Sequence, residues 1–183
     1  MYATELGANH LSDKTYFLPN LNSIFHDTKV SDLVGELSKM DRVIDFELEH
    51  EYRNTRRDDY HSRGSYIPDA VLKVMDAKGK SSMDIGLELE LTQKSEKRIS
   101  TKIKKGLIDN RYDLILYFFP SEALYKKYLT NLNSLPSKEA RAKCAMFWTP
   151  DLIVGELNIE SILGSYLGRP ALLSQFLGNI RHE

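Results

Sequence analysis

Residues 66–74 (Tyr-Ile-Pro-Asp-Ala-Val-Leu-Lys-Val) and 85–94 (Ile-Gly-Leu-Glu-Leu-Glu-Leu-Thr-Gln-Lys) decide the fold of this chain. Both stretches predict β-strands, because side chains alternate between the faces of a strand and apolar residues recur here at every second position. In the second stretch, aliphatic side chains share one face, and Glu88 and Glu90 share the other. The polar segment between the stretches suits a hairpin turn, so antiparallel pairing would bring Asp69 beside both glutamates.

Carboxylates that converge at the ends of neighbouring strands form an oxygen-rich site of the kind that Mg²⁺ or Mn²⁺ prefers. A metal ion in such a site activates water and neutralises phosphate charge, and this chemistry cleaves phosphodiester bonds. The pattern therefore predicts a divalent-metal site built from Asp69, Glu88 and Glu90. The plainer alternative, which the pattern leaves open, is a strand face whose carboxylates are simply solvated.

Hydrophobic periodicity along the chain predicts an α/β fold, with a mixed central sheet flanked by helices. We expect residues 1–28 to form an N-terminal lead-in segment and residues 29–183 to form one domain that ends in a helical tail over residues 159–180. Helices are expected from a cap at Asp27 or Thr28 to Leu37, over residues 95–105 with Gly106 stopping or bending the helix, and from Ser121 to Leu129. Strands are expected at residues 42–51, 66–74, 85–94, 113–119 and 145–148.

The expected helix between Glu90 and Asp113 makes a crossover connection, so the strands on either side of it should be parallel. The strand at residues 113–119 is continuously apolar, which is typical of a strand buried on both faces. Asp151 repeats the Pro-Asp pair, but no Glu-x-Glu strand follows it, so we interpret that position as a turn.

The composition limits the classes of protein to which the chain can belong. A chain that is 42% hydrophobic and 28% charged can form a globular core, and its net charge of −1 does not by itself indicate a nucleic-acid partner. We find no signal peptide and no apolar run long enough to cross a bilayer, so we expect a cytoplasmic protein without a membrane partner. The single cysteine, Cys144, excludes an internal disulfide framework and a cysteine zinc site, and we expect its thiol to be half-buried.

Basic residues are concentrated in two short segments. Lys97, Arg98, Lys104 and Lys105 lie on the expected helix 95–105, and Arg56 and Arg57 lie in the polar segment 54–65. Such clusters are often solvated faces. Beside a metal site, however, they would contact the phosphate backbone of DNA, with contacts that depend on salt and not on base sequence.

Pro68-Asp69, Glu88-x-Glu90, the basic helix after them and the α-β-β-β-α-β order together resemble the PD-(D/E)XK nuclease superfamily, which has a restriction-endonuclease-like core. Residues 67–71, 87–95, Lys102 and 112–118 look like the replication-relaxation family, which includes MobC-type relaxases. The resemblance implies a Mg²⁺- or Mn²⁺-dependent DNA endonuclease that nicks one strand at the transfer origin of a plasmid or conjugative element. It also implies accessory mobilisation proteins as partners.

The chain departs from the superfamily pattern at one position, because Glu90 stands where that pattern has a lysine. We expect Lys94 or Lys102 to supply the missing positive charge, and we favour Lys94 because it directly follows the strand. Glu90 would then be a metal ligand or accept a proton from the attacking water. Glu49 and Glu51 would complete an outer shell around the site, and Glu36 is a weaker candidate.

Two alternatives to a hydrolytic enzyme stay open. The first is a non-catalytic DNA-binding protein, accessory to replication or mobilisation, that keeps the fold with a degenerate site. The second is a covalent mechanism in which a tyrosine such as Tyr16, Tyr60 or Tyr66 attacks the phosphate, although nothing in the sequence marks one of them. The scattered histidines do not form the His-x-His pair that tyrosine relaxases use.

Overall fold

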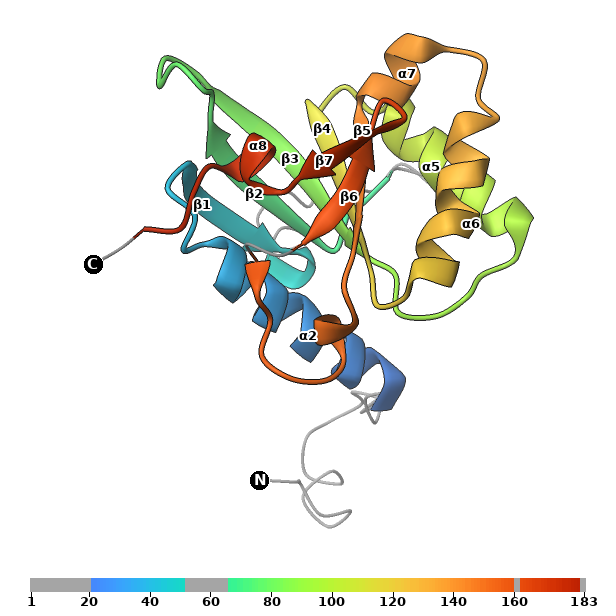
Figure 1. Ribbon diagram of the computed structural model, residues 1–183, viewed down its shortest axis with the longest axis horizontal. Helices are drawn as coiled ribbons and strands as arrows, with labels where there is room; N and C mark the ends of the chain where they lie inside the picture. The colour runs from blue at the N-terminus through green and yellow to red at the C-terminus, as the bar shows by residue number, and fades with distance from the viewer. Residues whose placement is uncertain (1–20, 52–65, 160–161, 182–183) are drawn as a thin grey trace, which may run out of the picture.

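The computed structural model describes residues 21–51, 66–159 and 162–181 (Figure 1). Its helices are α2 (Leu21–Leu37), α5 (Glu96–Ile108), α6 (Glu122–Asn133), α7 (Lys138–Ala142) and α8 (Ser174–Leu177), with a 3₁₀ turn η1 (Pro150–Leu152). Its strands are β1 (Val43–Leu48), β2 (Ala70–Met75), β3 (Ser82–Leu89), β4 (Leu114–Phe119), β5 (Cys144–Trp148), β6 (Leu163–Tyr166) and β7 (Arg169–Leu172).

The strands form one mixed sheet in the order β1-β2-β3-β4-β5-β6-β7. The central strands β3, β4 and β5 run parallel to one another, and every other neighbouring pair is antiparallel. This arrangement confirms the predicted α/β fold with a mixed sheet. It also confirms that the crossover through α5 joins two parallel strands, because Gly86 pairs with Ile115 in parallel register.

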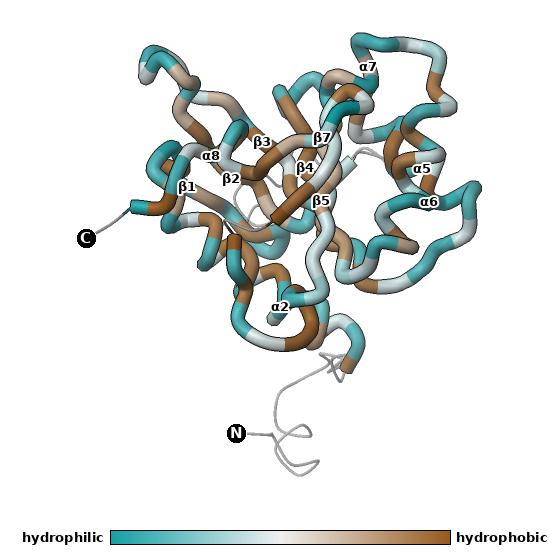
Figure 2. Tube along the Cα trace, viewed as in Figure 1, coloured by the Kyte–Doolittle hydropathy of each residue, from teal (hydrophilic) through white to brown (hydrophobic). Residues whose placement is uncertain are grey.

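Helices cover both faces of the sheet, which creates two hydrophobic cores (Figure 1). On one face the predicted apolar stripe of α2 packs against β2, β3 and β4, through Val30, Leu33, Val34 and Leu37. On the other face, Ile99 and Ile103 of α5 pack together with α6 against β4 and β5. Figure 2 shows the hydrophobic residues concentrated along the central strands. Every residue of β4 is buried, as its apolar run predicts.

The prediction for the C-terminal tail is wrong in most of its length. Instead of helices, residues 163–172 form the antiparallel hairpin β6–β7, and only the short α8 follows it. Leu167 and Gly168 have φ values of 52° and 75°, so both central residues of the turn adopt the positive φ that tight hairpin turns require. Leu167 is an unusual residue for this position, and the turn is therefore hard to recognise from sequence.

Helix α2 begins at Leu21, earlier than the cap expected at Asp27 or Thr28. The hydroxyl of Thr28 does not cap a helix start but donates to the carbonyl of Ile24 within the helix, at 2.8 Å. The lead-in prediction therefore overlaps the helix by eight residues (21 to 28), and residues 1–20 lie outside the described residues.

Two smaller predictions are also corrected by packing. Cys144 is completely buried at the start of β5, not half-buried, and burial raises the pKa of its thiol. Strand β1 ends at Leu48, so Glu49 and Glu51 lie in a helical turn after the strand and not along it. Asp151 lies in the turn η1, as expected, and the Thr149 hydroxyl accepts a hydrogen bond from its backbone N–H at 3.3 Å.

Gly106 does not stop α5, because the helix continues to Ile108. Its role is close packing: a Cβ at this position would lie 2.5 Å from Cδ1 of Ile115 and 3.0 Å from Cζ of Tyr66. The missing side chain therefore lets α5 approach the sheet closely.

We predict that Gly106→Val lowers the free energy of unfolding by about 1–3 kcal/mol, because the added side chain overpacks the space between α5 and β4. Gly35→Ala in α2 is the matched control, since a Cβ there would meet nothing within 4 Å. We expect that control to stabilise the helix by up to about 1 kcal/mol. Urea denaturation measures both, and equal stabilities of Gly106→Val and wild type would contradict the packing role.

Candidate functional site

Two buried glutamates lie where β3 ends. Glu88 is inside the strand and Glu90 follows its last residue, and their exposures are 0% and 1%. Leu87 and Leu89, which alternate with them, pack into the core beneath α2. The alternation read from the sequence therefore holds, and both carboxylates point toward the face that α5 covers.

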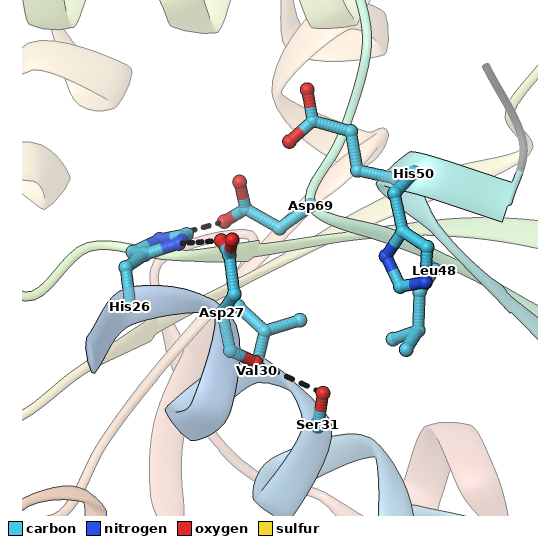
Figure 3. A pocket seen from close by; sticks show the side chains of 8 residues that line it. His26, Asp27, Val30, Ser31, Leu48, His50 and Asp69 are labelled. Carbon is cyan, nitrogen blue, oxygen red and sulfur yellow. Dashed lines mark hydrogen bonds and ion pairs between the residues drawn. The ribbon is translucent and has the colours of Figure 1, made fainter. Parts of the chain in front are cut away.

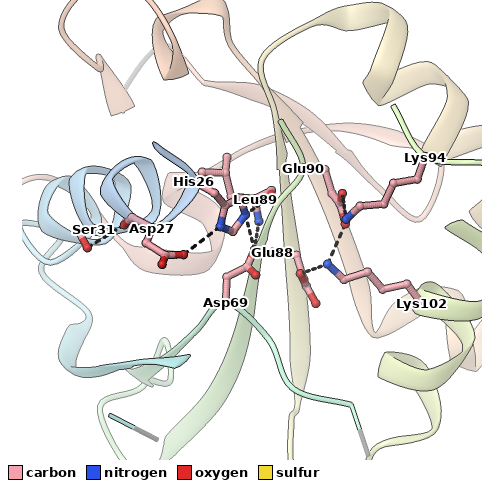
Figure 4. A network of polar contacts seen from close by, with 9 residues as sticks. All are labelled: His26, Asp27, Ser31, Asp69, Glu88, Leu89, Glu90, Lys94 and Lys102. Carbon is pink, nitrogen blue, oxygen red and sulfur yellow. Dashed lines mark hydrogen bonds and ion pairs between the residues drawn. The ribbon is translucent and has the colours of Figure 1, made fainter. Parts of the chain in front are cut away.

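Two lysines approach these glutamates from the other side (Figure 4). Lys102 of α5 donates to Oε1 of Glu90 at 2.8 Å and also contacts Oε2 of Glu88. Lys94, in the loop before α5, lies 2.5 Å from Oε2 of Glu90. The ammonium of Lys102 thus bridges both carboxylates, whereas the ion pair of Lys94 within the described residues is with Glu90. The sequence favours Lys94 as the substitute for the missing lysine, but the geometry brings Lys102 closer to Glu88.

Asp69 lies at the start of β2, opposite the end of β3, as the hairpin argument predicts. Its backbone N–H donates to the carbonyl of Leu87 at 2.9 Å, and its Oδ2 accepts from the N–H of Leu89 at 2.7 Å. The Nε2 of His26 lies 3.5 Å from the same Oδ2 and 3.0 Å from the carbonyl oxygen of Leu89. Asp69 is therefore fixed at the edge of the site by β3 and α2 together (Figure 4).

Burial dominates the electrostatics of Glu88. Loss of solvent raises the pKa of its carboxyl to about 8, with repulsion from Asp69 adding to the effect and Lys102 opposing it. Among the described residues, no group donates a hydrogen bond to Oε1 of Glu88 in good geometry. A buried carboxylate with an unpartnered oxygen is costly, so this position favours a proton or a bound cation.

The pKa values of Lys102 and Asp69 are instead shifted in the directions that favour their charged forms. Burial alone would lower the pKa of Lys102, but Glu88, Asp69 and Glu90 together outweigh it and raise that pKa. Burial alone would raise the pKa of Asp69, but the hydrogen bond with His26 and the attraction to Lys102 lower it. Lys102 is therefore an ammonium, and Asp69 a carboxylate, at neutral pH.

The predicted metal site of three carboxylates is not preformed in the described residues. Within residues 21–51, 66–159 and 162–181, no three histidine, cysteine, aspartate or glutamate side chains lie close enough to hold a metal ion. Glu90 forms ion pairs with both Lys94 and Lys102. Asp69 and Glu88 remain as the pair of carboxylates that could contribute oxygen ligands.

A basic groove lies beside the site, and the two lysines that contact the glutamates are among the residues that line it. It encloses about 420 Å³ and is lined by Tyr66, Ile67, Lys94, Lys97, Arg98, Thr101, Lys102 and Lys105. The predicted basic residues Lys97, Arg98, Lys104 and Lys105 are all exposed on α5. Arg56 and Arg57 lie outside the described residues, as do Tyr16 and Tyr60. Lys94 and Lys102, which line the groove, therefore connect it to the buried carboxylates of Glu88 and Glu90.

The three outer acidic candidates differ in their position. Glu49 lines a hollow of about 230 Å³ and so lies near the site. Asp69 and His26 line the same hollow (Figure 3). Glu51 accepts a hydrogen bond from the backbone N–H of Leu48 at 3.0 Å, and Glu36 pairs with Lys39 at 2.7 Å. These last two carboxylates have local partners on their own segments.

Sequence reasoning missed His26. It lies four residues before Val30 and therefore continues the buried stripe of α2 toward the sheet. The helical spacing reveals it only when the helix is started at Leu21 and not at Asp27. Tyr66, at the edge of the groove, is one tyrosine among ten in the sequence, and its hydroxyl is buried without a hydrogen-bond partner in the part of the chain described.

A scan of protein-family models and searches of curated proteins and of solved structures found no match to this chain. In the described part of the chain, none of the helices has the length and apolar character needed to cross a bilayer.

We predict that His26 makes stability depend on pH. The hydrogen bond with Asp69 raises the pKa of His26 to about 9 against burial, so its contribution is complete below pH 6.5 and is lost as the pH rises through 9. Because the imidazole is partly exposed, we expect on the order of 1 kcal/mol. The fall in thermal midpoint between pH 6.5 and 9 should be smaller for His26→Gln than for wild type. Equal falls would contradict the ion pair with Asp69.

Proposed function

We propose that this protein is a metal-dependent DNA endonuclease. The observation that carries the proposal is the position of the Lys102 side chain, which lines the basic groove and contacts two buried carboxylates, Glu88 and Glu90. Asp69 lies beside Glu88, directly before the first residue of the neighbouring strand β2 (Figure 4). Strongly perturbed titratable groups that cluster beside an open groove are typical of functional sites.

Stability alone gives a poor reason for this cluster. Burying charged groups costs several kcal/mol per ion, and replacing a buried ion pair by apolar residues is often neutral or stabilising. Around Glu88 the packing is apolar and aromatic, with Tyr117 and Ile103 buried nearby in the same core. The charges therefore fit a chemical role better than a structural one.

The residues fit a divalent cation in a specific way. Mg²⁺ is commonly held by one or two carboxylates, with waters and substrate phosphate oxygens completing its shell, so a three-carboxylate cage is not required. Asp69 and Glu88 would be the two protein ligands, and a cation would satisfy the unpartnered Oε1 of Glu88. When bound, the ion would supply an activated water and a positive charge against the scissile phosphate.

The chain's own residues would bind and orient the nucleic acid. Lys97, Arg98 and Lys105 on the groove contact the phosphate backbone, since they are exposed and their charges are free to meet phosphate oxygens. Lys102 places a fixed positive charge beside the scissile phosphate, where negative charge increases in the transition state. Glu90 holds the ammonium groups of Lys94 and Lys102 in position.

The order of elements supports the finer part of the proposal. The run α2-β1-β2-β3-α5-β4 has the α-β-β-β-α-β order of a restriction-endonuclease-like core. Within this proposal we retain the more specific expectation of a relaxase that nicks one strand at a transfer origin. The competing candidate, a non-catalytic DNA-binding accessory protein, is favoured by Glu90 in the lysine position, because Lys102 and Lys94 neutralise that carboxylate in the absence of metal.

We predict that the protein converts supercoiled plasmid to open circles with Mg²⁺ or Mn²⁺ but not with EDTA. Asp69→Asn should lower the rate by about 100-fold or more, because the neutral amide loses most of its attraction for the cation, while DNA binding stays near normal. Asp151→Asn is the matched control, since Asp151 belongs to a second Pro-Asp pair that lies in a turn. DNA binding without cleavage by wild type would favour the accessory protein.

We also predict which lysine acts on the phosphate. In single-turnover cleavage at saturating DNA, Lys102→Gln should lose rate without losing DNA affinity, because its charge acts only as the transition state forms. Lys94→Gln should be affected less, since the ion pair of Lys94 within the described residues is with Glu90. Equal rates for both variants and wild type would remove both lysines from the mechanism.

The basic groove generates a prediction about salt. The double variant Lys97→Ala/Arg98→Ala should reduce the slope of log K for DNA against log salt by roughly one unit for each phosphate that the helix no longer neutralises. Lys78→Ala/Lys80→Ala removes the same charge from the exposed β2–β3 turn, which lies well away from α5 (Figure 1). Identical slopes for the two double variants would exclude α5 as the DNA-binding face.

A further inference from the structure

We propose that His26 is a positioning residue, which holds the carboxylate of Asp69 in the orientation that binds the cation. The inference rests on the proposed metal-dependent function and adds to it a residue on α2, outside the strands that carry the acidic groups. Figure 3 shows the His26 ring turned toward Asp69 across the hollow between α2 and the sheet.

Within the described residues, the contacts of the Asp69 carboxylate are made to one oxygen, Oδ2. Oδ2 accepts from the N–H of Leu89 at 2.7 Å and lies 3.5 Å from Nε2 of His26. In the described part of the chain, no hydrogen bond is found to the other oxygen, Oδ1. The contacts from β3 and α2 therefore fix the rotation of the carboxyl group and leave Oδ1 available to a ligand.

The contacts of the ring identify it as a hydrogen-bond donor and not as a metal ligand. The carbonyl oxygen of Leu89, 3.0 Å from Nε2, can only accept, so Nε2 must carry a hydrogen and has no lone pair to give to a metal. On the other side of the ring, Nδ1 lies 3.4 Å from Oδ1 of Asp27. Leu89 and Asp27 thus set the direction of the ring, and the ring in turn holds Asp69.

The carboxylate of Asp69 needs a contact that fixes its orientation, because it lies beside an open hollow. Asp69, His26, Leu48 and His50 line the hollow of about 230 Å³, which is large enough for a carboxylate to rotate into. Without a donor at position 26, Asp69 would keep one hydrogen bond, from Leu89, and would gain freedom to turn away from Glu88. Partners that orient metal ligands are commonly worth 10- to 100-fold in affinity.

The test uses two variants that remove the donor and one that retains it. His26→Phe keeps a ring of similar size without an N–H, and His26→Leu removes the ring. His26→Gln restores an N–H close to the place of Nε2. Calorimetric titration with Mn²⁺ should give a dissociation constant about 10- to 100-fold higher for the first two variants, and close to wild type for His26→Gln.

A second measurement needs no metal. Because the N–H of Leu89 donates to Asp69, a released carboxylate should leave that amide less protected, so hydrogen exchange at Leu89 should accelerate in His26→Phe. The amide of Glu90 is the internal control, since it donates to the backbone carbonyl of Phe118 at 3.0 Å. A purely structural role would lower the thermal midpoint and accelerate both amides alike.

The outcomes separate the two proposals. Wild type that binds no Mn²⁺ would overturn the metal-dependent function, and with it the role of His26 toward a cation. Wild type that binds Mn²⁺, together with His26→Phe and His26→Leu that bind it equally well and keep Leu89 protected, would overturn only the role of His26. Weakened binding in both variants that His26→Gln restores would support the inference.

Discussion

The ion pair that joins Lys102 to Glu88 and Glu90 is the constraint on which the site depends. Two carboxylates buried side by side repel each other, and an ammonium between them offsets that repulsion. The contact exists only because α5 lies close to the sheet, which requires the missing side chain of Gly106. The same closeness places Lys102 between the buried carboxylates and the basic groove, which it lines together with exposed basic residues of α5.

Much of the fold follows from periodicity in the sequence. The stripe of α2, the buried strand β4 and the parallel β3–β4 pair are all predictable, since each depends on local pattern or on a short connection. The β6–β7 hairpin is not, because its turn uses Leu167 where glycine or asparagine is usual. The ends of elements also differ by several residues where the local pattern is weak, as at Leu21.

In the candidate site, too, the residues placed by local sequence pattern are predictable, and those placed by tertiary packing are not. Strand alternation places Glu88 and Glu90 on one face, and hairpin pairing places Asp69 nearby. The choice between Lys94 and Lys102 cannot be made from sequence, because it depends on the distance between α5 and the sheet. The role of His26 cannot be predicted from sequence for a related reason. Its contact with Asp69 joins positions 43 residues apart, from 26 to 69, and depends on tertiary packing.

The central claim, that Asp69 and Glu88 hold a divalent cation beside the basic groove, is tested most directly by diffraction. Crystals soaked in Mn²⁺ and measured at the manganese absorption edge would locate the ion by its anomalous signal. The account predicts a peak at about 2.0–2.6 Å from a carboxylate oxygen of each of these two residues. A Mn²⁺ peak elsewhere would contradict the account. So would the absence of a peak at this site while Lys102 still bridges Glu88 and Glu90.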